Sequence, residues 1–344
     1  TLSGGSNNSV SGYYSTLSGG YKNSVSNGNQ TLSGGQQNKI EGGGYQTISG
    51  GYKNTSSNAY FNVIGGGFQN TAEGFVNTIS GGYKNKSLSG SYNTLAGGYG
   101  NTASGYNNVI SGGRKNFTTN DTNCVTISGG YENSISGYSV ASTIAGGRLN
   151  VMTCAAYASS ISGGYKNTLS VYNSYSTIAG GTENGMTNSY ASSISGGYRN
   201  AITNSGSSYS SYSVIVGGCS NLISGLTSSF ILGSNITADR SNTTFVENLT
   251  ITSLPTSAPT QSGAVWLNNG TLTIGSASGG SASGGGVSLH SSNSLSGYYP
   301  TISGGIGNNV SGTYSVVSGG ATNSVTDSNA STITGGLYNC IATG

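Results

Sequence analysis

A short motif, aliphatic-x-Gly-Gly-x-x-Asn, recurs seventeen times along this 344-residue chain and constrains its fold more than any other feature. The copies are 15 to 17 residues apart, with one spacing of 21 residues and one long gap. A fixed period this short predicts a solenoid, in which each repeat forms one coil and stacks on the next. The glycine pairs begin at positions 4, 19, 34, 50, 66, 81, 97, 112, 129, 146, 163, 180, 196, 217, 304, 319 and 335.

The residues of each copy indicate strands and corners. Glycine density and many Ser, Thr and β-branched residues exclude helix. Thr-Ile-Ser reads as a strand with Ile inward and hydroxyls outward, and Gly-Gly turns the corner because glycine adopts positive φ freely. We expect the Asn residues to stack in an amide ladder and to tolerate a left-handed corner. The fold class is therefore all-β, a parallel β-solenoid (β-roll) of 15–17-residue coils. The predicted ladder residues include Asn8, Asn23, Asn38, Asn54, Asn70, Asn85, Asn101 and Asn116.

Composition limits the partners of this chain. Only 6% of residues are charged and 33% are hydrophobic. Tyr, Ile and Val recur at a fixed phase, which distinguishes the chain from a disordered one. The net charge is only +3, with no Lys/Arg cluster in the sequence, so we expect no nucleic-acid partner. The sequence contains no run of 18 apolar residues, so we expect no membrane insertion. Two apolar residues per coil make a thin core, so we expect a homo-oligomer.

Two positions after the glycine pair vary in a regular way. The residue before the Asn alternates between Lys and Gln, as in Lys53 and Gln69, and later between Lys and Glu. This avoids like charges on neighbouring coils, about 4.8 Å apart. The residue before that is aromatic in many copies, with Arg alternating with Tyr further on, which suits cation–π contacts. The aromatic row is either a glycan-binding site or a subunit seam. Its members are Tyr52, Phe68, Tyr83, Tyr99, Tyr131, Tyr165 and Tyr198.

Residues 234–299 interrupt the period and divide the chain into three parts. Residues 1–233 form the first repeat array, and residues 300–344 form a second array that we expect to continue beyond the fragment. Between them we expect a strand over 245–251 and a hairpin of 264–267 and 271–274 with a turn at Asn-Gly. Trp266 is expected to anchor this small module. Residues 275–286 have the composition of a Gly/Ser linker.

Several copies resemble a known class of repeats. "TIAGGRLN", "SISGGYRNAI" and "NTASGYNNVISGG" are similar to head and shaft repeats of trimeric autotransporter adhesins and of phage or giant-virus tail-fibre proteins. The segment 228–274 also resembles the segment that follows such repeats in viral fibre proteins. The resemblance implies a left-handed, homotrimeric β-roll on an extracellular fibre, of a virion or of a cell surface.

No pattern for catalysis stands out. The only histidine, His290, lies in polar sequence, and the eight acidic residues are scattered, so neither a nucleophilic triad nor a paired-carboxylate site is predicted. Cys124, Cys154, Cys219 and Cys340 lack metal-site spacing, although a Cys124–Cys154 bridge is conceivable. We therefore expect no enzyme, metal or cofactor. We expect a structural fibre that associates with itself, including end to end, and that binds a surface glycan. The alternative is an ice-binding solenoid with Thr-x-Ser ladders, as at Thr47 and Thr78.

Overall fold

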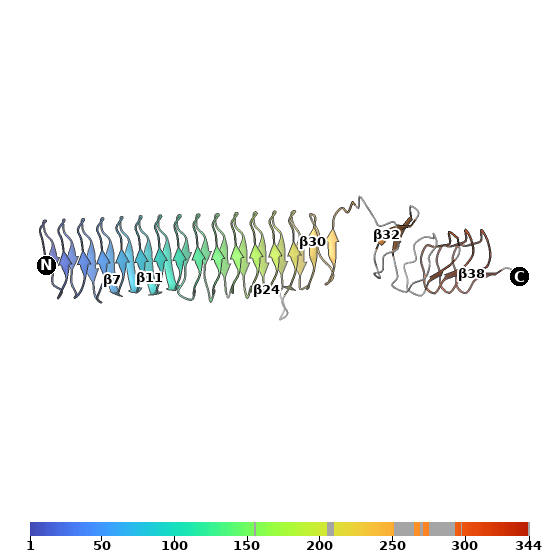
Figure 1. Cartoon of the computed structure of the whole chain (residues 1–344), viewed down its shortest axis with the longest axis horizontal. Coiled ribbons are helices and arrows are strands. Elements are labelled where there is room, and N and C mark those ends of the chain that lie inside the picture. The colour runs from blue at the N-terminus through green and yellow to red at the C-terminus, as the bar shows by residue number, and fades with distance from the viewer. Residues whose placement is uncertain are drawn as a thin grey trace. The chain divides into compact units, whose positions relative to one another are not determined.

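The computed structural model describes residues 1–154, 156–204, 210–250, 265–268, 271–274, 293–296 and 298–342. Every regular element in these ranges is a β-strand. The chain forms two units, Thr1–Asn248 and Leu249–Gly344. In the first unit, successive coils stack along one axis, so that equivalent strands lie side by side (Figure 1). The prediction of an all-β parallel β-solenoid is confirmed.

Each coil of the first unit contributes one strand to each of two sheets. All neighbouring strands within both sheets run parallel, and each pairs with the strand one coil further on, as Thr78 pairs with Thr94. The 15-stranded sheet contains β2 (Thr16–Leu17), β4 (Thr31–Leu32), β6 (Thr47–Ile48), β8 (Val63–Ile64), β10 (Thr78–Ile79), β12 (Thr94–Leu95), β14 (Val109–Ile110), β16 (Thr126–Ile127), β18 (Thr143–Ile144), β20 (Ser160–Ile161), β22 (Thr177–Ile178), β25 (Ser193–Ile194), β28 (Val214–Ile215), β30 (Phe230–Leu232) and β31 (Thr244–Val246).

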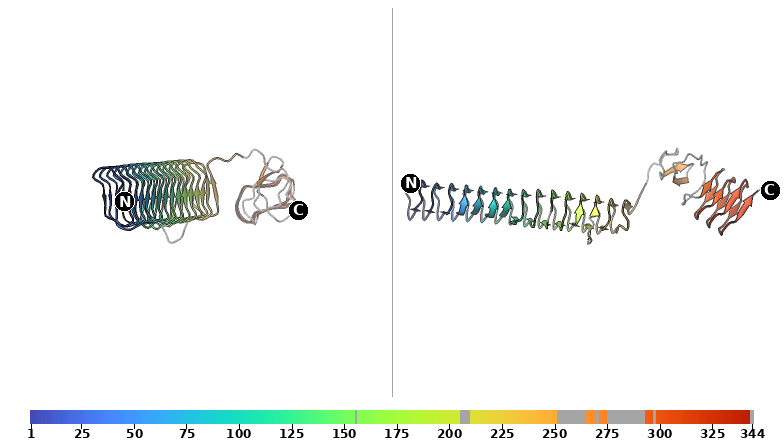
Figure 2. Two further views of the ribbon diagram at one scale, coloured as in Figure 1. Left: turned by 60° about the vertical axis from the view of Figure 1, so that its left-hand side comes forward. Right: turned by 90° about the horizontal axis from the view of Figure 1, so that it is seen from below.

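The 14-stranded sheet closes the other side of the coil (Figure 2). It contains β1 (Ser9–Val10), β3 (Ser24–Val25), β5 (Lys39–Glu41), β7 (Thr55–Tyr60), β9 (Thr71–Phe75), β11 (Lys86–Ser91), β13 (Thr102–Tyr106), β15 (Phe117–Thr118), β17 (Ser134–Ile135), β19 (Val151–Thr153), β21 (Thr168–Ser170), β23 (Gly185–Thr187), β26 (Ala201–Thr203) and β29 (Leu222–Ser224). A further parallel pair joins β24 (Ser189–Tyr190) to β27 (Ser210–Ser211).

The core is a double row of side chains between the two sheets. The 15-stranded sheet supplies a fully buried Leu or Ile from every coil between Leu17 and Ile231. The 14-stranded sheet supplies Ile40, Ile135 and similar residues at its ends, but much smaller side chains in the middle. Those small residues are Ser56, Ala72, Ser87, Ala103 and Thr118. The apolar core is therefore thinnest in the coils between residues 55 and 118.

The second glycine of each pair brings the coils into backbone contact. At Gly82, φ is +91°, and an added Cβ would lie 2.4 Å from the carbonyl oxygen of Gly98 in the next coil. Only glycine meets both conditions without strain. A Cβ on Gly81 would have no neighbour within 4 Å. The second glycine is therefore required for close contact between coils. The first glycine, as at Gly81, makes no such contact.

The coil stack extends past residue 233. β31 pairs with β30, and Leu222 forms a parallel bridge with Thr237. In the second unit, β32 (Val265–Asn268) pairs antiparallel with β33 (Thr271–Ile274), whereas the expected turn at 269–270 and the expected linker lie outside the described residues. Parallel stacking resumes at Ser294. The strands there are β34 (Ser294–Leu295), β35 (Thr301–Ile302), β36 (Asn309–Val310), β37 (Val316–Val317), β38 (Ser324–Thr326), β39 (Thr332–Ile333) and β40 (Cys340–Ala342).

Candidate functional site: the two edges of the solenoid

The Asn that recurs in every copy of the motif joins each coil of the first unit to the next. The backbone N–H of Asn85 donates to Asn70 Oδ1 at 2.9 Å, and the N–H of Asn101 donates to Asn85 Oδ1 at 3.0 Å. Asn85 Nδ2 also donates to the carbonyl oxygens of Gly81 and Gly98. The amide is fully buried with both polar atoms hydrogen-bonded, which is the arrangement that buried polar groups require. We call the edge built by these residues the first edge.

The amide ladder runs the length of the first unit and reappears in the second. It begins at Asn8, which accepts from the N–H of Asn23, and ends where Asn221 accepts from Ile236. In the second unit it runs from Asn293 to Asn339. The eight ladder residues named from the sequence all have these contacts. Along the first unit the bonds between ladder residues run from backbone N–H to amide oxygen, whereas in the second unit Asn339 Nδ2 also donates to Asn323 Oδ1.

The left-handed residue of this corner is not the Asn. The residue before it has positive φ, as in Lys53 at 55° and Gln69 at 55°, whereas the ladder Asn residues do not. The expectation that Asn occupies the left-handed corner is therefore wrong. The reason is that the Asn side chain must point inward to reach two carbonyl groups, so the preceding residue makes the turn and points outward.

Four aromatic side chains of the first edge, from Tyr52 to Tyr99, form one continuous stack. Ring centroids lie 4.8 Å apart for Tyr52 and Phe68, 4.9 Å for Phe68 and Tyr83, and 5.0 Å for Tyr83 and Tyr99. Arg114 then lies between Tyr99 and Tyr131, with its guanidinium carbon 5.2 Å and 5.4 Å from their centroids.

Further along the same row, Arg148 lies between Tyr131 and Tyr165, at 5.2 Å and 5.7 Å from their centroids. Tyr198 follows after Thr182. The expected alternating cation–π contacts are present. Because the rings face one another along the stack, a ligand beside it would reach ring edges and hydroxyl groups, and not ring faces.

The charged residues of the first edge alternate as the sequence predicts. Lys115 Nζ lies 3.2 Å from Glu132 Oε1 in the next coil, and Arg199 Nε lies 2.7 Å from Glu183 Oε2. Hydrogen bonds from Tyr131 and then Lys115 lower the pKa of Glu132. The hydrogen bond from Arg199 lowers the pKa of Glu183. Each carboxylate thus forms an ion pair with a basic residue of a neighbouring coil.

The opposite, second edge carries its own polar ladder, which the sequence reasoning missed. The N–H of Asn77 donates to Asn62 Oδ1, and the N–H of Asn93 donates to Asn77 Oδ1. Serines take over later, where Ser142 Oγ accepts from the N–H of Ser159. The signal was a half-repeat, because each coil holds two segments of about eight residues. The second segment also ends in a left-handed residue, which is followed by Asn, Ser or Gln in most coils and by Val125 in one.

Exposed aromatic side chains line the second edge. Tyr45 stacks on Phe61 at 5.1 Å, and Phe75 packs edge to face against Phe61 and Tyr92. A further group continues later in the unit: Tyr157, Tyr175, Tyr190 and Tyr212. All are exposed, by 36% to 62% of their surface. The two residues before each polar ladder position carry no charge anywhere along this edge, from Tyr13 and Tyr14 to Ser241 and Asn242.

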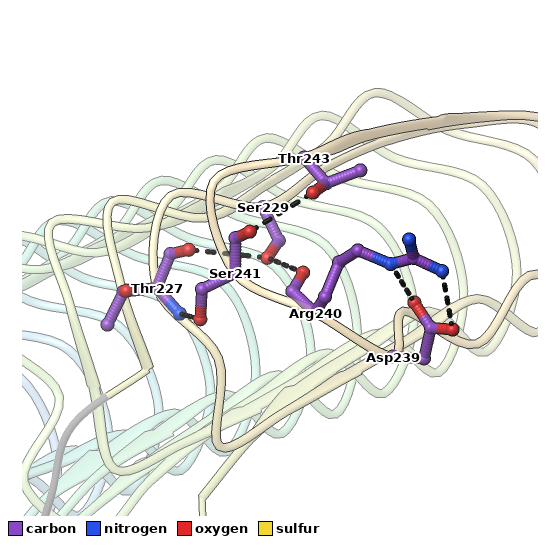
Figure 3. Close-up of polar contacts among 6 residues, drawn as sticks. All are labelled: Thr227, Ser229, Asp239, Arg240, Ser241 and Thr243. Carbon is purple, nitrogen blue, oxygen red and sulfur yellow. Dashed lines mark hydrogen bonds and ion pairs between the residues drawn. The ribbon is translucent and has the colours of Figure 1, made fainter. Parts of the chain in front are cut away.

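The last coil of the first unit closes the second-edge ladder with backbone and hydroxyl groups (Figure 3). Ser229 Oγ donates to the carbonyl oxygen of Arg240 at 3.1 Å, and the N–H of Thr227 donates to Ser241 Oγ at 2.9 Å. Arg240 pairs with Asp239, with Nε 2.8 Å from Oδ1. The stacking geometry therefore persists to this coil although its sequence departs from the motif.

The described residues form no cluster of metal-binding side chains. Within the described ranges, no three His, Cys, Asp or Glu side chains come close enough to hold a metal ion. The four cysteines are free, so the Cys124–Cys154 bridge is not formed. His290 lies outside the described residues. In the part of the chain that the structure describes, no helix has the length and apolarity to cross a membrane.

No protein-family model matches this chain, and no curated protein is similar to it at a significant level.

Proposed function

We propose that this chain is a structural fibre protein with an adhesive role, in a virion fibre or a filament of the cell surface. The observation that carries the proposal is the amide ladder from Asn8 to Ile236, along which every coil binds the next through the same buried groups. Fifteen strands at the usual spacing give the first unit a length of about 70 Å. A stack of this kind resists bending and displays its side chains in straight rows, which suits a shaft.

Copies of the chain would pack through the second edge. The core is thinnest between residues 55 and 118, and the exposed rings of Tyr60, Phe61, Phe75 and Tyr92 lie beside these same coils. Aromatic residues without neighbouring charge are typical of the buried centre of an interface. Burial of these rings between two copies would add apolar contact at the coils whose own apolar core is thinnest. The resemblance to adhesin and tail-fibre repeats implies three copies and a left-handed roll.

Sedimentation combined with electron microscopy of the purified chain tests this proposal. We expect elongated particles that contain more than one copy, together with binding to glycan-coated or cell surfaces. A chain that remains monomeric at high concentration and binds no surface would contradict it.

Ice binding is the second candidate, and one observation favours it. The outward positions of the 15-stranded sheet, such as Thr78 and Ser80, carry no charged residue in any coil, and Thr pairs with Thr in register at β2–β4–β6. The outer face of the 14-stranded sheet instead includes Lys39, Glu41 and Lys86. Measurement of thermal hysteresis tests this role, and its absence at high protein concentration would remove it.

A further inference from the structure

The first edge collects most of the positive charge of the chain. Eight of the 11 Lys and Arg residues lie in its two outward rows, together with only two of the eight acidic residues, Glu132 and Glu183. The sequence showed no basic cluster because these residues are far apart along the chain. Stacking of the coils brings them into line. The eight basic residues are Lys22, Lys53, Lys84, Arg114, Lys115, Arg148, Lys166 and Arg199.

Three of these residues form a regular series without carboxylate partners. Among the described residues, no acidic group lies within ion-pair distance of Lys22, Lys53 or Lys84. Each is exposed, and each Nζ lies 5.0 Å from the ring centroid of the tyrosine before it. They occupy every second coil, so they repeat at about 10 Å, twice the strand spacing. Gln37 and Gln69 occupy the coils between them.

We propose that the first edge binds a linear acidic polysaccharide that carries one carboxylate or sulfate per disaccharide. A sugar unit in an extended β-linked chain advances by about one coil, so an anionic group on every second sugar meets every second coil. The ammonium groups of Lys22, Lys53 and Lys84 would pair with these anions. The Gln69 amide would hydrogen-bond the uncharged sugar between two anions, and the hydroxyls of Tyr52 and Tyr83 would lie beside the charged sugars. This inference rests on the proposed adhesive role and names its ligand.

Two other occupants fit the first edge less well. A second copy of the chain, packed edge to edge about an axis along the stack, would bring rows of lysines against each other, and like charges at close range repel. Double-stranded DNA carries a phosphate every 3.4 Å along each strand, which does not match lysines about 10 Å apart, and a single strand is tested below. An anion on alternate sugars matches both the sign and the period of the charge.

The test compares two variants that each lose two positive charges. Lys53→Gln with Lys84→Gln alters the first edge, and Gln37 and Gln69 show that glutamine fits this position of the coil. Lys39→Gln with Lys86→Gln is the matched control, because both residues lie on strands of the 14-stranded sheet. The probes are a hyaluronan oligosaccharide with one uronate per disaccharide, its carboxyl-reduced neutral form, and a single-stranded oligonucleotide with the same number of charges.

We expect the hyaluronan oligosaccharide to bind the unaltered chain, and to bind the first-edge variant about tenfold more weakly, because that variant lacks two exposed ion pairs to the ligand. The control variant should bind within about twofold of the unaltered chain. The neutral form should not bind, and added salt should weaken binding. An equal loss in both variants, tighter binding of the oligonucleotide, or no binding of hyaluronan would overturn the proposal.

Particle shape and copy number are measured on the same samples. Elongated oligomers that bind no acidic polysaccharide would contradict this inference and leave the fibre intact. A monomer that binds no surface would contradict the proposed function itself.

Discussion

At the scale of single residues, the second glycine of each pair is the most constrained position in the coil. Its backbone lies against the glycine backbone of the next coil, so a side chain has no room, and its φ near +90° disfavours any residue with a Cβ. The glycine before it lacks the close contact. Two adjacent glycines in one motif thus have different physical roles.

Gly82→Ala should therefore destabilise the chain by about 2–4 kcal/mol, because left-handed strain adds to overlap with the carbonyl oxygen of Gly98. Gly81→Ala is the matched control and should change stability by less than about 0.5 kcal/mol, as surface substitutions do. Chemical denaturation followed by circular dichroism measures both. Equal effects of the two substitutions would show that contact between coils does not govern this corner.

At the scale of the coil, the charge pattern of the first edge depends on which coil lies next to which. Lys53 and Lys84 are separated by one coil, which carries Gln69. Deleting residues 63–77 removes that coil in register and places Lys53 next to Lys84. Deleting residues 78–93 also removes one coil, but places Gln69 next to Gly100.

We expect both deletion variants to fold, because each coil contacts only its neighbours. The variant that lacks 63–77 should be less stable than the other by about 1 kcal/mol at low salt, the repulsion of two charges about 5 Å apart in water. The difference should disappear at high salt. Denaturation at two salt concentrations measures it, and a difference that does not change with salt would contradict the electrostatic origin.

Sequence reasoning predicted the coil and its two apolar residues, but it did not predict the polar ladder of the second edge. The spacing of Gly-Gly and Asn predicted parallel coils correctly, because every copy keeps the same three residue types. That ladder was missed because its residue type varies along the edge, from Gln46 to Asn62 to Ser142, and because this half of the coil often has no glycine pair. Residues beyond 233 also continue the stack without the motif, since backbone pairing between β30 and β31 needs no particular side chain.

At the scale of the whole molecule, the two edges of the first unit have opposite surface chemistry. The first edge is basic and its rings are stacked on one another. The second edge carries uncharged and more exposed rings. If copies of the chain associate as proposed, this contrast favours the second edge as the contact and leaves the first edge, with its row of Tyr52 to Tyr198, open to solvent and ligand.

Tyr45→Asn with Tyr92→Asn tests this assignment. Both tyrosines have positive φ, where Asn is better tolerated, and Asn29 and Asn107 occupy the same row in other coils. The single chain should keep its fold and stability, while its self-association should weaken at least about tenfold, because buried interface aromatics are typical hot spots. Tyr83→Ser with Tyr99→Ser, on the first edge, should leave self-association unchanged. Sedimentation equilibrium distinguishes the two, and the reverse result would place the seam on the first edge.

The spacing of the unpaired lysines also sets how such a rod can change its length. Lys22, Lys53 and Lys84 recur every 31 residues, so the charge pattern of this part of the first unit repeats every two coils. Gain or loss of one pair by recombination between copies changes the length by about 10 Å and keeps every neighbour compatible. Loss of the Gln69 coil alone instead places Lys53 and Lys84 on neighbouring coils. Shortening of this region by a double coil therefore avoids the repulsion that loss of one glutamine coil would create.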